Sequence, residues 1–478
     1  MGQYFDGYDY PAIHEYAKEI MKHRKHLKKS AMDRYTKYFD EKCAISKARV
    51  EPAKALIPGG IQHNLANNHP FPLSIAKAEG PYLYDEDGNR YIDLLMAGGP
   101  TILGNNFPTV RDTVCDFIRE NGPVTGMYSE KERELAELVT KYYPSCEMFR
   151  MLGSGTEADI IGIRLARAFT GRTHIVRIRG GYHGWSDQLV YNSDAIDSGT
   201  QLNGIPKDCF QNTHAIMPND AEDLERTIVS LEDKGGVAAF VMEAVGQDSG
   251  ALPTTREFHK KAAEICKKHG VLLIYDEVVT GFRLGLGGAQ SVMGTKPDLT
   301  IFGKIIGGGY PAAGGIGGRR DIMSRLAAGI GAQPADRVRV GGTLSANPMT
   351  ALAGITTIKE LARLNAHEKM AKAADYFIHG IAELTQKYDV PCLCFNQQSI
   401  LHIDPHAFQH IAFLYEKDDP EYAVQVKDAY MGMIEFAMAL AAEGVIISGG
   451  GKTYICYDSI PILDDALAAY ERVFKEFE

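Results

Sequence analysis

The sequence predicts an α/β protein with a mostly parallel central sheet flanked by helices. The apolar run VAAFVME ends at Glu243 and VLLIYDE begins at Val271, with the helix-like REFHKKAAEICKKHG between them. A strand, a helix and a strand within about forty residues predict a parallel pair with a crossover helix. The apolar segments HIVRIR and DLTIFG have similar lengths and predict two more strands.

Residues 11–50 are expected to be helical, because Ile13, Ile20, Met21 and Leu27 are spaced for one helix face. This segment contains the basic run KHRKHLKK. Flanking acidic residues favour a solvated helix face for this run, and an anionic partner is the alternative.

Two further regions complete the order of elements. In GPYLYDEDGNRYIDL, Asp87 and Gly88 predict a turn between two short strands of a hairpin. After residue 350, helices such as AHEKMAKAADYFIHGIAELTQKY alternate with short strands, and the chain ends in the helical DDALAAYERVFKEFE.

Composition excludes several classes of protein. The chain has 478 residues, 45% of them hydrophobic, and a net charge of −10, which argues against a nucleic-acid or membrane-surface binder. No apolar run is long enough to cross a bilayer, and MGQYFDGYDY lacks the pattern of a secretory signal, so a cytoplasmic protein is expected. The eight cysteines are scattered, which predicts reduced thiols and no metal site.

The residues that follow the predicted strands are the informative ones. Ligands of such sheets bind outside the carboxyl ends of the parallel strands. The side chains expected there are Gly153–Thr156, Tyr182, His183, Glu243, Asp276 and Lys304.

The stretch MLGSGTEADI fits two kinds of phosphate site. One is the dinucleotide pattern G-x-G-x-x-A, which Gly153, Gly155 and Ala158 match. Arg177 and Arg179 lie where NAD binding needs an acid, so among dinucleotides this interpretation leaves only NADP. Alternatively, the hydroxyls of Ser154 and Thr156 and the first amides of a helix hold one phosphomonoester. A simple helix cap by Ser154 is the third interpretation.

Lys304 and Asp276 favour the second of these sites. Lys304 is the only charged residue in TIFGKIIGGGYP, and a buried ammonium is costly, which favours an imine-forming lysine over one that reaches solvent. Asp276 follows LLIY and needs a cationic partner, which a protonated pyridine nitrogen provides. A phosphate cradle, an imine lysine and a strand-end acid together predict pyridoxal 5′-phosphate (PLP).

At this point the motifs GSGTEA, GGYHGWSD, IYDEVVTGFR, FGKIIGGGYP and GGTLSANP resemble a known family. They are similar to those of the class III aminotransferases, which are PLP enzymes of fold type I, and especially to the glutamate-1-semialdehyde aminomutase-like branch. The likeness covers roughly residues 50–478. It implies the fold type I organisation, with a large PLP-binding domain (101–345) and a smaller α+β domain from both chain ends (51–100 and 346–478), after an N-terminal helical extension (1–50).

The resemblance implies a role for each matching residue. Lys304 would form the internal aldimine and later move protons, and Asp276 would keep the pyridine nitrogen protonated. Tyr182 and Val278 would pack on opposite faces of the ring. The remaining implied contacts are His183 and Glu243 near the ring, Ser154, Gly155 and Thr156 at the phosphate, and Thr343 reaching the same phosphate from a partner subunit.

The substrate region departs from the family pattern. GGIQHNLA places Ala66 where the aminomutases have a carboxylate-binding arginine, which argues against glutamate-1-semialdehyde as the substrate. Gly153 also replaces the asparagine of that branch. Alternative substrate contacts are His63, Lys452 and Tyr128, with solvent exposure or packing as the other interpretation of each.

The resemblance implies an aminotransferase that acts on an amino acid or amine through a quinonoid intermediate, with a keto acid as acceptor. Aminomutase, epimerase and ammonia-lyase chemistry use the same residues and are alternatives. An NADP-dependent dehydrogenase is a remote alternative, since it leaves Lys304 and Asp276 without a role. The family also implies a homodimer with shared active sites.

Overall fold

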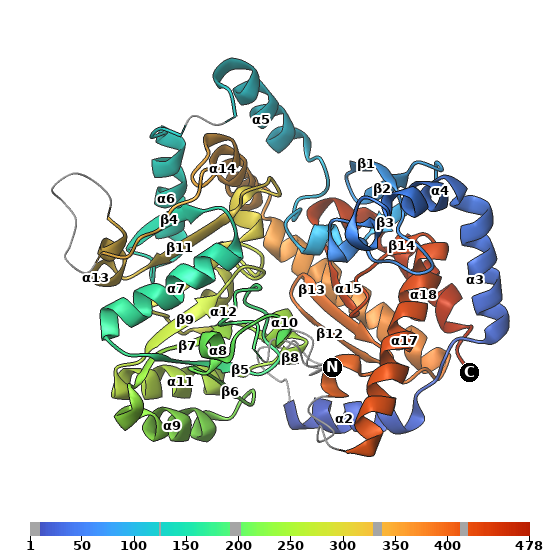
Figure 1. Ribbon diagram of the computed structural model, residues 1–478. Helices are drawn as coiled ribbons and strands as arrows, with labels where there is room; N and C mark the ends of the chain where they lie inside the picture. The colour runs from blue at the N-terminus through green and yellow to red at the C-terminus, as the bar shows by residue number, and fades with distance from the viewer. Residues whose placement is uncertain (1–9, 124–125, 192–201, 328–336, 412–418) are drawn as a thin grey trace. The chain divides into compact units, whose positions relative to one another are not determined.

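The computed structural model describes residues 10–123, 126–191, 202–327, 337–411 and 419–478 (Figure 1). Its contacts divide the chain into two compact units. Unit 1 consists of Met1–Phe107 and Asn365–Glu478, and unit 2 consists of Pro108–Leu364.

These limits differ from the domain boundaries expected at 100/101 and 345/346. The larger difference arises from helix α14 (Pro348–Arg363), which packs against helices α5 (Pro108–Asn121) and α6 (Glu130–Tyr142). Ten of its residues are buried, and these contacts with α5 and α6 place α14 in unit 2.

A seven-stranded sheet forms the centre of unit 2, in the order β4-β11-β10-β9-β7-β5-β6. Each neighbouring pair from β10 to β6 is parallel, whereas β11 is antiparallel to both β10 and β4. All strands except β11 therefore point the same way, which confirms the predicted mostly parallel sheet. The strands are β4 (Met148–Leu152), β5 (His174–Ile178), β6 (Thr213–Ile216), β7 (Val237–Glu243), β9 (Leu272–Asp276), β10 (Leu299–Gly303) and β11 (Gly314–Gly318).

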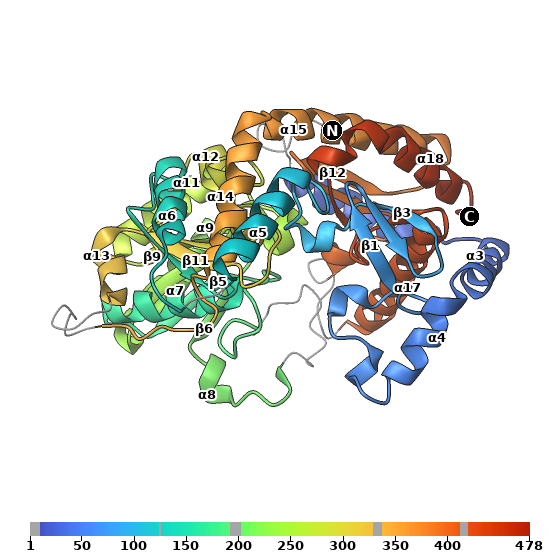
Figure 2. The same cartoon turned by 90° about the horizontal axis from the view of Figure 1, so that it is seen from above.

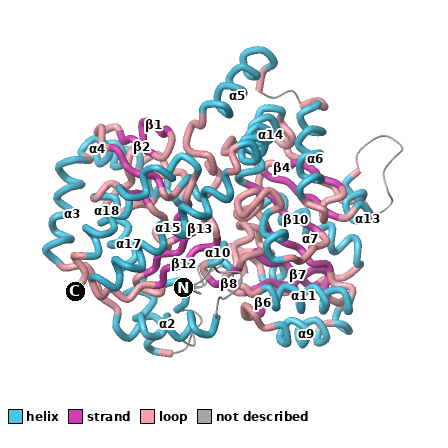
Figure 3. The backbone as a smooth tube through the Cα atoms, turned by 180° about the vertical axis from the view of Figure 1, so that it is seen from behind, coloured by secondary structure: helices cyan, strands magenta, loops and turns pink. Residues whose placement is uncertain are grey.

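Helices pack on this sheet and bury its apolar side chains. Helix α7 (Gly155–Thr170) contacts β7 and β10 (Figure 3) and also β11. Helix α11 (Arg256–His269) connects β7 to the adjacent β9, as the crossover pattern predicts (Figure 1). The core between α7 and the sheet includes Ile161, Leu165, Ile274, Ile301 and Ile316. The other elements of this unit are α8 (Lys207–Phe210), α9 (Ala221–Ser230), α10 (Gln247–Gly250), β8 (Leu252–Pro253), α12 (Gly288–Met293), η6 (Lys304–Gly307) and α13 (Arg320–Met323).

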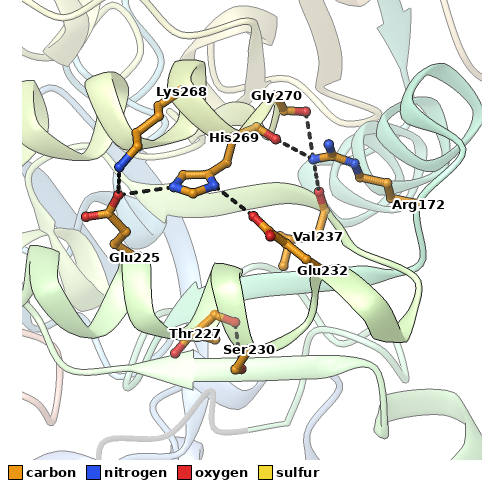
Figure 4. A network of polar contacts seen from close by, with 9 residues as sticks. All are labelled: Arg172, Glu225, Thr227, Ser230, Glu232, Val237, Lys268, His269 and Gly270. Atoms are coloured by element: carbon orange, nitrogen blue, oxygen red, sulfur yellow. Dashed lines mark hydrogen bonds and ion pairs between the residues drawn. The ribbon is translucent and has the colours of Figure 1, made fainter.

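An arginine links three backbone segments at one end of this sheet. Nη1 of Arg172 donates to the carbonyl oxygens of Val237 at 3.2 Å, His269 at 2.7 Å and Gly270 at 3.0 Å (Figure 4). His269 and Gly270 end helix α11, where carbonyls lack helical partners, so the guanidinium caps the helix and fixes it to the start of β7.

Unit 1 contains two small sheets, β1-β2-β3-β14 and β12-β13-β15. Strands β2 and β3 pair antiparallel around Asp87 and Gly88, as the hairpin pattern predicts. Helices α15 and α18 lie side by side (Figure 2). Its elements after the first helices are β1 (Ile75–Glu79), β2 (Tyr82–Asp85), β3 (Arg90–Asp93), α15 (Ala366–Lys387), β12 (Leu393–Gln397), β13 (Ile400–Asp404), α17 (Pro420–Ala442), β14 (Val445–Ile446), β15 (Lys452–Tyr454) and α18 (Leu463–Phe474).

The first residues of unit 1 form three helices, α2 (Tyr10–His23), α3 (Lys29–Lys42) and α4 (Ala44–Ala53). The helical expectation is confirmed, and Lys22, His23 and Lys29 of the basic run are exposed on α2 and α3, but the middle of the run is not a solvated helix face. Residues 24–28 lie between α2 and α3, and the Arg24 side chain is 4% exposed and pairs with Asp428. Lys25 pairs with Asp389 at 2.8 Å, so the basic residues hold the N-terminal helices to the C-terminal half of the unit.

Two further observations concern the whole described chain. Among the described residues, none of the helices combines the length and apolarity needed to cross a bilayer. All eight cysteines are free thiols, and six of them are buried.

Candidate active site

The predicted site residues of unit 2 gather where the parallel strands end. Ser154 follows β4, Tyr182 and His183 follow β5, and Glu243 and Asp276 are the last residues of β7 and β9. Lys304 comes directly after β10. Since these strands run parallel, the residues meet at one edge of the sheet.

The turn between β4 and α7 has the geometry of an anion site. Ser154 is the N-cap residue of α7, and its hydroxyl accepts a hydrogen bond from the Glu157 amide at 3.2 Å. The Glu157 side chain in turn accepts from the Gly153 amide at 2.9 Å. The capping interpretation is therefore confirmed, and it leaves the hydroxyl proton of Ser154 as a donor at the positive end of a 16-residue helix.

Glycines allow this turn to lie close to its neighbours. A Cβ on Gly155 would lie 2.6 Å from Val278 Cγ2, and one on Gly303, just before Lys304, would lie 2.8 Å from Val278 Cγ1. A Cβ on Gly314 of β11 would lie 2.3 Å from the Ser154 carbonyl oxygen. Glycine is thus required at each position for the turn, Val278 and the lysine segment to approach so closely.

Asp276 is a buried acid with two hydrogen-bond donors. Its Oδ1 accepts from the Val278 amide at 2.9 Å, and its Oδ2 lies 2.7 Å from Nδ1 of His183. Burial lowers the pKa of His183, so the ring is neutral and its Nδ1–H donates to the carboxylate. The arrangement holds the carboxylate in one orientation and leaves it lone pairs for a further donor.

Tyr182 and Glu243 are linked through the backbone. The Tyr182 amide donates to Oε1 of Glu243 at 2.8 Å, and Glu243 is buried. The Tyr182 side chain is 54% exposed although it lies next to the buried His183. An aromatic face of this size beside a buried acid is available to a planar ligand.

Lys304 has an uncommon backbone conformation. It begins the short helix η6 with φ of 49°, in the left-handed region, and its side chain is half-buried. Strained conformations of this kind persist only where the surrounding structure enforces them, and they concentrate at functional sites.

The structure places the remaining predicted residues as follows. Thr343 lies in an exposed turn before α14, and Tyr128 is 71% exposed with its hydroxyl 2.9 Å from Glu130 Oε2. In unit 1, His63 is exposed and caps the short helix of Asn64–Ala66, the segment that contains the position of the absent arginine. Lys452 is half-buried on β15.

Sequence reasoning missed two buried acids beside the site. One carboxylate oxygen of Asp159 on α7 lies within 4.8 Å of a ring nitrogen of His183 and of a carboxylate oxygen of Asp276, and Asp159 is 3% exposed. Its signal was the one recognised for Lys304, a charge surrounded by apolar residues, here in ADIIGI. Burial raises the pKa of Glu277, which accepts from the amides of Ala289 and Gln290 and fixes the chain beyond β9.

Arg177 is buried and bound to backbone carbonyls, which the sequence did not predict. It is fully buried on β5, and its guanidinium donates to the carbonyls of Ile178, Gly181, Leu189 and Tyr191. It therefore stabilises the turn that carries Tyr182 and His183, whereas an NADP site would need this arginine free to bind a phosphate.

The residues present fit PLP. A capped helix start with a hydroxyl donor suits its phosphate, and a buried acid with spare lone pairs suits its ring nitrogen. The exposed ring of Tyr182 and the side chain of Val278 suit a flat ring, and a lysine at the same edge suits its aldehyde.

Known proteins resemble this chain over most of its length. The family model for Aminotransferase class-III matches residues 64–455. A glutamate-1-semialdehyde 2,1-aminomutase from Chloroherpeton thalassium is 38% identical over 375 residues, which cover 75% of this chain and 85% of that protein. One from Desulforamulus reducens is 38% identical over 364 residues, which cover 74% and 81%.

Solved structures of transaminases have a fold similar to that of this chain. An omega-transaminase from Sphaerobacter thermophilus has a TM-score of 0.81 and 27% identity, covering 92% of this chain and 99% of that one. A β-phenylalanine aminotransferase from Variovorax paradoxus has a TM-score of 0.79 and 26% identity, covering 93% and 96%. The chain has the fold of these transaminases and belongs to the class III aminotransferase family of enzymes.

Proposed function

We propose that this enzyme uses PLP to transfer the amino group of an amino acid or amine to a keto acid. The observation that carries the proposal is the convergence of Lys304, the His183–Asp276 pair and the Ser154 turn at one edge of one sheet. When bound, PLP supplies an electron sink for the electron pair left when a substrate C–H bond breaks.

The residues of this chain divide the work of holding the cofactor. Ser154, Gly155 and Thr156 would bind the phosphate, and Asp276 would accept a hydrogen bond from the protonated ring nitrogen. Tyr182 and Val278 would pack on the two faces of the ring. His183 orients Asp276, and Glu243 orients the Tyr182 backbone. Thr343 of the partner subunit reaches the same phosphate in a homodimer, which its exposed position permits.

Lys304 has two tasks in this scheme. Its amine would hold the cofactor through the aldehyde carbon until a substrate amine takes its place. The freed amine would then accept the proton that the substrate carbon loses and give it up again, so that Lys304 would act as general base and then as general acid. Its place immediately after β10 keeps the amine at the sheet edge throughout.

The substrate is an amino acid or amine that needs no arginine at position 66. Ala66 leaves that place without a guanidinium, so His63, Lys452 or Tyr128 supplies the contact to a substrate carboxylate where one is present. The proteins with similar structures are named an omega-transaminase and a β-phenylalanine aminotransferase, which makes β-amino acids and amines the first substrates to test.

Aminomutation is the second candidate function. The curated relatives named glutamate-1-semialdehyde 2,1-aminomutase favour it, since they share 38% of the matched sequence. Epimerase and ammonia-lyase activity would use the same lysine and acid.

One experiment separates these activities. Purified enzyme with PLP is given amines, β-amino acids and glutamate-1-semialdehyde, with and without pyruvate or 2-oxoglutarate, while products and ammonia are measured. We expect turnover only when a keto acid is present. Turnover without one, and without ammonia, would assign a mutase or epimerase instead, and ammonia release would assign a lyase.

A further inference from the structure

A second buried carboxyl lies beside the acid that faces the cofactor. We call Asp159, His183 and Asp276 the buried triad, since they are 3%, 0% and 5% exposed. One carboxylate oxygen of each acid and one ring nitrogen of His183 lie within 4.8 Å of one another. The two acids come from different elements, α7 and β9, so the fold and not a local turn brings them together.

Hydrogen bonding distinguishes the two acids. Asp276 has a donor on each oxygen, from the Val278 amide and from His183 Nδ1. Oδ1 of Asp159 is buried and has no hydrogen-bond partner among the described residues. A carboxylate keeps its charge where donors meet it, so the negative charge of the triad belongs on Asp276 and the proton on Asp159.

The surroundings of Asp159 also favour its protonated form. The groups that face Asp159 are Asp276 on β9, Glu243 on β7 and Arg177 on β5. Burial, then the Asp276 charge, raises the pKa of Asp159 well above its usual value, and the charge of Glu243 adds to this increase. The opposing charge of Arg177 is smaller in effect than either burial or Asp276.

We infer that Asp159 is a positioning residue that stays protonated beside His183 and thereby leaves Asp276 as the single negative charge of the buried triad. His183 Nε2 is also buried without a partner among the described residues, so the triad contains both a carboxyl proton and an unused acceptor. The charge on Asp276 is what the ring nitrogen of PLP requires. This last step rests on the proposed function, whereas the protonation of Asp159 does not.

Infrared difference spectroscopy of the full-length protein, as purified, tests the protonation. The spectrum of Asp159→Asn is subtracted from that of the wild type at neutral pH. We expect the carbonyl band of a neutral carboxylic acid, with no ionised carboxylate band. Asp116→Asn, an exposed acid on α5, is the matched control and should give ionised carboxylate bands only. Carboxylate bands in the Asp159 difference spectrum would overturn the inference.

Cofactor binding tests the consequence. The dissociation constant of PLP for Asp159→Asn should stay within about threefold of the wild-type value, because Asn is also neutral, whereas Asp276→Asn should raise it at least about tenfold. Equal losses in both variants would overturn the charge assignment. If Asp159→Asn does not fold, Asp159→Thr replaces it in both measurements.

Two controls complete the design. A wild type that binds no PLP would refute the proposed function and leave the infrared result to decide the protonation of Asp159. The metal content of the purified protein is measured as well, since carboxylates and an imidazole also ligate metals. A stoichiometric metal ion in the wild type that Asp159→Asn lacks would overturn the inference.

Discussion

His183 Nδ1 lies 2.7 Å from Asp276 Oδ2, and both side chains are buried. The ring thus supplies one of the two donors that hold this carboxylate, and the Val278 amide supplies the other. A buried charge that loses a donor is destabilised, so this contact is a sensitive point of the site.

Replacing His183 with Phe should weaken PLP binding. Phe keeps a ring of similar size but removes the donor, and hydrogen bonds to charged groups are worth about 1.5 to 3 kcal/mol. We expect the dissociation constant, measured by absorbance after dialysis, to rise at least about tenfold. His379→Gln, at an exposed position on α15, is the control and should bind like the wild type. Unchanged binding by His183→Phe would show that Asp276 does not depend on the ring.

Gly155→Ala should destabilise unit 2 and weaken PLP binding. The added Cβ would lie 2.6 Å from Val278 Cγ2, and overpacking of this kind costs about 1 to 3 kcal/mol. The double variant with Val278→Ala should recover part of the loss in unfolding free energy, as measured by denaturant titration. Gly341→Ala, where a Cβ meets nothing within 4 Å, is the control. Additive effects in the double variant would contradict the contact.

Lys304→Ala should abolish turnover and the visible absorption band of the bound cofactor. The substitution removes the amine that bonds to PLP and moves the proton, while the left-handed backbone tolerates Ala about as well as Lys, so the melting temperature of the apo-protein should be unchanged. Borohydride reduction followed by peptide mass analysis of the wild type should place a pyridoxyl group on Lys304. An adduct on another lysine would refute the assignment.

Stability should fall as the pH drops below about 6.5. Burial lowers the pKa of His259, His406 and His410 from 6.5 to about 3 in the folded protein. The three rings are neutral in both states at high pH, but the unfolded chain alone binds protons as the pH falls through 6.5. Each should cost about 1 kcal/mol of unfolding free energy between pH 7 and 5.5.

The variant His410→Leu tests this pH dependence. Neither ring nitrogen of His410 has a hydrogen-bond partner among the described residues, so the substitution removes a titrating group without breaking a bond. Denaturant titrations at the two pH values should show that the loss between them is smaller by about 1 kcal/mol than in the wild type. An equal loss would mean that His410 is not buried as a neutral ring.

Arg172→Met should lower the unfolding free energy of unit 2. Its guanidinium donates hydrogen bonds to three carbonyl oxygens. A buried carbonyl left without a donor lowers the unfolding free energy by about 1 to 3 kcal/mol. Arg226→Met is the control, because its pair with Asp223 is exposed and such pairs contribute about 0 to 1 kcal/mol. Similar midpoints of chemical denaturation for both variants would contradict the role of Arg172.

The sequence predicted best those features that depend on neighbours along the chain. Hydrophobic runs defined β7, α11 and β9, and Asp87 with Gly88 defined a hairpin. The strand-end rule then placed Asp276 and Lys304 at one edge, because parallel strands share a direction whatever their order.

Features that depend on distant partners were missed. Arg24 belonged to a basic run that suggested a solvated surface, yet Asp428, 404 positions away, binds it. Asp159 is a single charge in the apolar segment ADIIGI of α7, and its neighbours are His183 in the loop after β5 and Asp276 at the end of β9. The boundary expected at 345/346 falls before helix α14, because a sequence pattern does not say which surface covers a helix, whereas the contacts of α14 with α5 and α6 lie within unit 2.

Strand β11 limits how this enzyme can be diversified. Added methyl groups at Gly314, Gly315, Gly317 and Gly318 would each come within 2.6 Å of a neighbouring atom. In a saturation library, nearly every clone altered at these four codons should therefore be lost before selection for a new substrate begins. Randomisation aimed at substrate scope is better directed at the segments that carry His63 and Tyr128, where the side chains are exposed.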